Sequence, residues 1–267
     1  MVFFVVKIQK QKPSSNLHTH MKNKALLLLL SAALMAGCRF TTSKDNDDDD
    51  KDSATGTVVH SSGRGVFNLG NKAGVKTARL NLEAGAIVVN LADTTDKLFN
   101  AVVTDTTRKF ELSQETTDAG EVVNFRMREH KHNFHDDSAS VSLRLNTSPQ
   151  WEIKAKVAAA QCTFDLSKFK ISKLGLSCAA GDVHIKLAPV LPDTYVDINA
   201  SVGAIIIRIP QDAACEVHVE SALADEDFPG FQKEDSNHYQ TAGFATSKNK
   251  IHIDANCSLS SFKIERY

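Results

Sequence analysis

Apolar and polar residues alternate strictly in many short segments of the chain beyond residue 65. The alternating segments are 78–82, 87–91, 151–157, 162–166, 183–187, 196–198, 205–209 and 251–255. A period of two places the apolar side chains on one face of an extended strand and the polar side chains on the other. Since no segment shows the 3.6-residue period of an amphipathic helix, the pattern predicts an all-β protein with half-buried strands.

The strands also repeat along the chain. The apolar positions of 176–187 match those of 198–209 at an offset of 22 residues and those of 155–166 at an offset of 21. Two further stretches, 80–91 and 255–264, fit the same frame. One such unit cannot bury its own apolar face, so we expect the units to stack on one another.

Each unit contains a corner at which a three-residue step interrupts the alternation. The corners are rich in small residues: Ala84-Gly85-Ala86, Ala179-Ala180-Gly181 and Val202-Gly203-Ala204. One extra residue turns all later side chains to the opposite face unless the backbone bends, and glycine tolerates the dihedral angles of such a bend. The sequence therefore predicts a single-stranded, right-handed β-helix-like solenoid, or stack of β-hairpins, with Val183, Ile205 and Phe262 in a narrow aliphatic core.

The N-terminal part of the chain has the features of an export signal. A basic segment precedes an apolar run at 25–36, and small residues lead from that run to Cys38. The run is shorter than the roughly 20 apolar residues that a membrane-spanning helix needs. The cysteine resembles that of the lipobox of bacterial lipoproteins, which implies lipid attachment at Cys38. A signal that began at Met1 would have an unusually long region before the apolar run, so we expect the signal to start at Met21. The alternative is an ordinary secretory signal with an unmodified cysteine.

An acidic segment follows the signal. Residues 39–64 contain the run TTSKDNDDDDKD and little apolar surface, so we expect an extended, disordered tether. A second interpretation is an address for surface export, since some surface lipoproteins carry a lysine followed by acidic residues, as at Lys44-Asp45. The predicted organisation is a signal at 1–38, the tether at 39–64, an N-terminal β part at 65–148 and a β-repeat domain at 149–267.

Four cysteines lie in the strand-rich part: Cys162, Cys178, Cys215 and Cys257. Export to an oxidising compartment allows two disulfides, whereas buried single thiols are the alternative. Cys178 and Cys257 occupy equivalent repeat positions, with Ala200 in the unit between them. Stacking in that order separates them by about 9–10 Å, given a strand spacing of ~4.8 Å, so we expect no bond between these two.

Charge and motifs argue against several functions. The formal net charge is −1, which gives no basic surface for nucleic acid. The chain has no P-loop, dinucleotide fingerprint or G-x-S-x-G elbow, so we expect neither an enzyme nor a cofactor. A glycan-active enzyme with paired carboxylates is the remaining alternative, but Asp165, Asp182 and Asp197 share their faces with Thr, Lys and Arg and are expected to be solvated.

A histidine-rich tract at 129–137 is one candidate binding segment. On a strand, His130 and His132 face the same side, and His135 or Asp136 completes a divalent-metal site. The other interpretation is a polar hairpin tip.

The segment 221–250 is the second candidate, because it breaks the repeat. Its aromatic residues either cap the end of the stack or form a recognition surface: Phe228, Phe231, Tyr239 and Phe244. Three histidines elsewhere lie between apolar strand residues and are expected to be solvated on the outer face: His184, His218 and His252.

The repeat resembles the toastrack domain of LiaF-like bacterial envelope proteins and related domains of unknown function. The resemblance rests on FDLSxFxIxxL from Phe164, AAGDV from Ala179, and the stretch from Val202-Gly203 to Arg208-Ile209-Pro210. It covers about 75–264 and implies a non-enzymatic envelope domain. Serines replace the usual glycines in the last unit, and a lipid signal replaces the family's membrane helices.

These features together predict a non-catalytic lipoprotein of the bacterial cell envelope. Lipid at Cys38 holds it to a membrane, with the outer membrane favoured and either its periplasmic or its surface face presenting the domain. The expected role is a scaffold, adhesion or sensing module with an envelope protein or a glycan as partner. The alternative is a metal- or glycan-binding surface protein.

Overall fold

The chain divides between residues 51 and 52. The computed structural model describes parts of the compact unit that follows, namely 57–62, 65–104, 108–128, 139–221 and 225–267. Cys38, the signal and most of the predicted tether lie outside the described residues. The last part of the predicted tether, Thr57–Ser62, is strand β1, because it pairs with the edge of β6.

The described part consists almost entirely of strands, which confirms the predicted all-β class. The helix η1 spans only Phe244–Thr246. The remaining strands are β2 (Gly65–Leu69), β3 (Thr77–Ala84), β4 (Ile87–Thr94), β5 (Phe99–Val103), β6 (Lys109–Thr117), β7 (Gly120–Arg128), β8 (Ser140–Leu145), β9 (Gln150–Asp165), β10 (Lys170–Lys186), β11 (Asp193–Ile209), β12 (Ala214–Ser221), β13 (Asp225–Asp227), β14 (Phe231–Lys233), β15 (His238–Thr241) and β16 (Lys250–Arg266).

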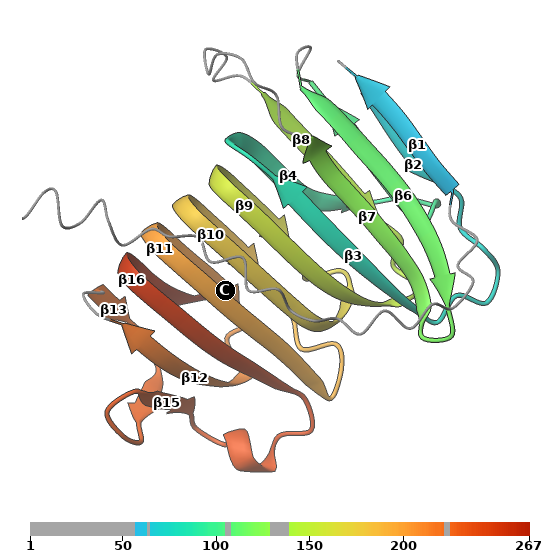
Figure 1. Cartoon of the computed structure of the whole chain (residues 1–267). Coiled ribbons are helices and arrows are strands. Elements are labelled where there is room, and N and C mark those ends of the chain that lie inside the picture. Colours follow the sequence, from blue (N-terminus) through green and yellow to red (C-terminus); the bar gives the residue numbers. More distant parts are fainter. Residues whose placement is uncertain (1–56, 63–64, 105–107, 129–138, 222–224) are drawn as a thin grey trace, which may run out of the picture. The chain divides into compact units, whose positions relative to one another are not determined.

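Four long strands, β9, β10, β11 and β16, lie side by side in the middle of this unit (Figure 1). Each contributes its first half to one layer and its second half to another. β3 pairs with the first half of β9 and β4 with the second half, and β12 and β13 divide β16 in the same way. The long strands pair in parallel, whereas antiparallel hairpins lie at the ends of the layers.

The observed register confirms the predicted repeat. Leu176 pairs with Ile198 in β11 and with Ala155 in β9. Ile198 in turn pairs with Ala255 in β16. The units therefore stack as toast-rack ribs, and the offset of 22 residues between β10 and β11 holds from Lys173 to Lys186.

The N-terminal stretch joins the stack two residues away from its predicted frame. Leu82, rather than Leu80, lies beside Ala155. A shift of two residues keeps every side chain on the same face, so alternation alone does not exclude it. In the observed register the small Ala78 lies beside the large, fully buried Trp151.

Apolar side chains form continuous ladders between the two layers. The first layer contributes Val123, Leu80, Ile153, Leu174, Val196, Ile253 and Val217, all buried. The second layer contributes Val141, Val89, Cys162, Val183, Ile205 and Phe262, also buried. The predicted inward orientation of Val183, Ile205 and Phe262 is therefore confirmed.

The four cysteines of the described part are buried thiols, and no disulfide joins them. Ala200 separates Cys178 from Cys257 in the register, as the repeat predicts. Burial, assisted by the neighbouring Cys178, raises the pKa of the Cys162 thiol to about 12. These residues therefore act as small apolar side chains of the core.

The corners bring backbones of neighbouring ribs very close together. Gly181 and Gly203 are register partners, and each has a φ of 144°. A Cβ atom added to Gly203 would overlap the carbonyl oxygen of Gly181. Glycine is therefore required at this position both by the dihedral angle and by the lack of space.

Candidate functional site

Polar side chains cover the outer face of the first layer in rows that follow the strand register. One row consists of Arg79, Glu152, Lys173, Tyr195, His252, Glu216 and Gln240. Cross-strand ion pairs connect its members to each other and to the next row. Arg79 Nη2 lies 2.9 Å from Glu152, and Lys173 Nζ lies 2.7 Å from Asp197.

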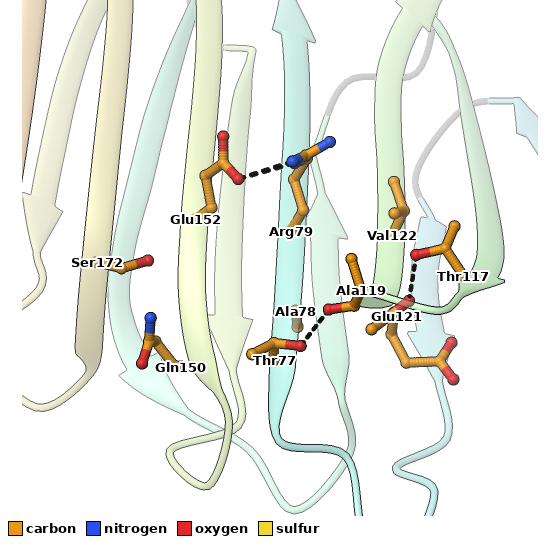
Figure 2. Close-up of a pocket in the computed structure, with 11 residues that line it drawn as sticks. Thr77, Ala78, Arg79, Thr117, Ala119, Glu121, Val122, Gln150, Glu152 and Ser172 are labelled. Carbon is orange, nitrogen blue, oxygen red and sulfur yellow. Dashed lines mark hydrogen bonds and ion pairs between the residues drawn. The ribbon is translucent and has the colours of Figure 1, made fainter. Parts of the chain in front are cut away.

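A shallow hollow of about 250 Å³ opens on this face where β3 and β9 run beside the turn between β6 and β7. Figure 2 shows the ion pair of Arg79 and Glu152 at one side and the β6–β7 turn at the other. Thr77 Oγ1 donates a hydrogen bond to the carbonyl oxygen of Ala119 and fixes this turn to β3. Hydroxyl, amide and charged groups therefore line the hollow together with apolar surface, to which Ala78, Ala119 and Val122 contribute.

Glu121 lies at the base of the same turn with its side chain almost completely buried. Lys72 Nζ donates to it at 2.9 Å, Gln114 Nε2 at 2.8 Å and Thr116 Oγ1 at 3.0 Å. Burial opposes ionisation, but these hydrogen bonds and the charge of Lys72 outweigh it and lower the pKa of Glu121. Both acidic residues that line the hollow thus form ion pairs, Glu121 with Lys72 and Glu152 with Arg79.

A second polar cluster lies at the other end of the first layer, on β12, β15 and β16. Glu216 and His218 are two residues apart on β12 and share its outer face. His238 on β15 is the register partner of His218, and their rings stack with centroids 4.1 Å apart. One ligand atom each from Glu216, His218 and His238 lie within 4.8 Å of one another.

His252 on β16 connects this cluster to β11. Its Nδ1 lies 2.5 Å from Glu216 Oε1, its Nε2 lies 3.1 Å from Asp193, and its ring stacks on Tyr195. Burial alone would raise the pKa of Glu216, but the hydrogen bond and charge of His252, together with the nearby His238 and Gln240, lower it. The expected outer-face position of His218 and His252 is confirmed. His218 is exposed, as expected, whereas His252 is largely covered by its partners and is not simply solvated.

The sequence predicts only part of this cluster. Alternation in Glu216-Val217-His218 places both polar side chains on one face. His238 lies in a segment without a clear strand pattern, and it reaches the cluster because β15 returns antiparallel beside β12. That return is a long-range pairing that periodicity does not reveal.

Three of the four aromatic residues predicted in the segment 221–250 form one group. Phe228 lies 4.9 Å from Tyr239 and 6.1 Å from Phe231, measured between ring centroids, and 5.3 Å from the core residue Phe262. Phe244 lies apart from them, buried edge-on against His252. The group covers the last rib, and this position agrees with the predicted cap of the stack.

Comparison with known proteins identifies the family. Residues 47–208 match the family described as the N-terminal domain of toast_rack, DUF2154. The chain belongs to this family. Toast_rack domains are associated with the bacterial envelope, and the match agrees with the resemblance found in the repeat.

Solved structures were compared with this chain, and the first one below shares its fold. A "putative cell adhesion protein" from Clostridium sporogenes ATCC 15579 is 19% identical, with a TM-score of 0.70 over 79% of this chain and 100% of that chain. A "putative adhesin" from Bacteroides fragilis NCTC 9343 is 8% identical, with a TM-score of 0.28 over 78% and 97% of the two chains. No curated protein matches the chain.

The remaining predicted site residues of this toast_rack chain lie outside the described residues: Cys38, His130, His132, His135 and Asp136. Within the described ranges, no helix combines the length and the apolar character needed to cross a membrane.

Proposed function

We propose that the chain is a lipid-anchored protein of the bacterial outer membrane whose toast_rack domain is a non-catalytic adhesion module. The outer face of the first layer carries this proposal. It is a continuous polar surface on parallel ribs, and the acidic groups of its hollow are committed to ion pairs. The fold shared with a protein named for cell adhesion supports the same role.

The chemistry of the hollow favours a glycan as the adhesive target. Its hydroxyl, amide and ion-paired groups are donors and acceptors that match sugar hydroxyls. Its volume of about 250 Å³ lies just below the range of about 300–1,000 Å³ that drug-sized ligands occupy. A sugar-sized group at the end of a longer glycan therefore fits it better than a large apolar ligand.

The anchor is tested by replacing its cysteine in cells. The wild-type chain is expected in the detergent phase of a membrane fractionation, held by two or more acyl chains. Cys38→Ala is expected in the aqueous phase, because it lacks the lipid attachment point. Equal partitioning of the two proteins would contradict the lipid anchor. It would not bear on the adhesion role, which the binding experiment tests separately.

The binding role is tested with an immobilised panel of bacterial and host cell-surface glycans. Ala119 is exposed and lines the hollow, so Ala119→Trp fills the hollow without entering the core. Ala242→Trp places the same side chain at an exposed position outside the hollow and serves as the control. We expect retention of the wild type and of Ala242→Trp, and loss with Ala119→Trp. No retention, or equal retention of all three, would contradict glycan binding at the hollow.

A further inference from the structure

We propose that Glu216, His218 and His238 form a Zn²⁺ site at the end of the first layer. Two imidazoles and one carboxylate are a ligand set that zinc uses in proteins, with a water as the fourth ligand. Calcium and magnesium prefer sites made of oxygen ligands alone. The chemistry of the cluster therefore favours a transition-metal dication, and this site is distinct from the histidine-rich tract at 129–137.

The strand register places the three ligands on one surface. His218 and His238 are directly opposite each other on antiparallel strands, where Cβ atoms lie about 4.5–5.5 Å apart. Glu216 precedes His218 by two residues and points to the same side. The ligand atoms now lie within 4.8 Å of one another. Zinc–nitrogen distances of about 2.0–2.1 Å require these atoms to move closer together. Rotation of these side chains, none of which is fully buried, would supply this approach without moving the strands.

An unsatisfied ring nitrogen points to a missing ligand in this cluster. His238 Nε2 is buried and has no hydrogen-bond partner, although it lies 3.4 Å from Glu216 Oε2. A buried polar atom without a partner costs free energy. A cation between the imidazole nitrogen and the carboxylate would satisfy both groups at once.

Neighbouring residues already hold the carboxylate ligand in place. His252 binds Glu216 Oε1 at 2.5 Å and is itself held by Asp193 and stacked on Tyr195. This chain of contacts leaves Glu216 Oε2 directed toward His238. Groups that orient a ligand from behind typically change metal affinity about 10- to 100-fold when they are removed. His252 is therefore a positioning residue of the proposed site.

Zn²⁺ at this position would connect β12 and β15, which pair at one end of the first layer. β12 is the last rib of the first layer, and β15 is held to it by three register pairs. β15 also carries Tyr239, which packs against Phe228 in the aromatic cap. Metal binding would therefore stabilise the cap as well as the hairpin.

The test uses the full-length chain with His130, His132 and His135 replaced by Ala in every sample, so that the tract contributes no ligands. Zn²⁺ is titrated in competition with a chromophoric chelator. We expect one Zn²⁺ per chain, loss of binding in His218→Asn and in His238→Asn, and a 10- to 100-fold weaker affinity in His252→Gln. His184→Asn, at an outward strand position on β10, is the matched control and is expected to bind like its parent.

A second measurement separates a metal site from a change in folding. Co²⁺ in place of Zn²⁺ is expected to give the visible absorption of a four-coordinate site in the parent and in His184→Asn, but not in His218→Asn. Without metal, all variants are expected to melt at the same temperature, and Zn²⁺ is expected to raise the melting temperature only where the site is intact. Absence of Zn²⁺ binding in the parent, or equal binding in His218→Asn and His184→Asn, would overturn the proposal.

Discussion

At the scale of single residues, Glu121 shows how the rack accommodates a buried charge. Hydrogen bonds from Lys72, Gln114 and Thr116 satisfy its carboxylate at the start of β7. A carboxylate buried without such partners would be neutralised or would destabilise the fold. The sequence does not distinguish Glu121 from the other acidic residues, because the partners that bury and bind it come from separate parts of the chain.

The lowered pKa of Glu121 makes stability depend on pH. A carboxyl group whose folded pKa lies below its ordinary value of 4.5 contributes stability above that value and loses it as the pH falls through the folded pKa. Glu121→Gln is therefore expected to lower the free energy of unfolding by about 1–3 kcal/mol near neutral pH. Urea denaturation should show this difference shrinking on acidification. Glu83→Gln, at an exposed position of β3, is the control, and a difference independent of pH would contradict the assignment.

At the scale of elements, the bent long strands define the fold. Their repeat could be predicted because every rib places apolar residues at the same positions, such as Cys178, Ala200 and Cys257. The two-residue shift of β3 could not be predicted, since both registers bury the same face. The pairing of His238 with His218 was also beyond the pattern, because a four-residue strand carries almost no periodic signal.

The corner glycines provide the sharpest test at this scale. Gly203→Ala forces a Cβ atom onto the carbonyl oxygen of Gly181 at a φ of 144°. We expect a loss of about 2–4 kcal/mol in unfolding free energy, measured by chemical denaturation. Gly175→Ala is the matched control on β10, because its added Cβ meets no atom closer than 4.0 Å. Similar losses in the two variants would mean that the ribs do not touch at the corner.

At the scale of the whole described unit, chain order and spatial order differ at the last ribs. β12 follows β11 in the sequence, yet β16 lies between them (Figure 1). The segment between β12 and β16 carries β13, β14, β15 and the aromatic cap. This arrangement places Glu216 beside His252, and both the candidate metal cluster and the cap of the stack depend on it.

The order of these ribs is the claim on which the account depends most, and cross-linking of paired cysteines tests it directly. Asp197, Asp254 and His218 occupy one row on β11, β16 and β12. Neighbouring ribs place Cα atoms about 4.8 Å apart, within disulfide range, whereas ribs two apart are separated by about 9–10 Å. After mild oxidation, peptide mass mapping is expected to find a disulfide in Asp197→Cys/Asp254→Cys and none in Asp197→Cys/His218→Cys. The reverse result would show that β12 lies beside β11 and would contradict the fold described.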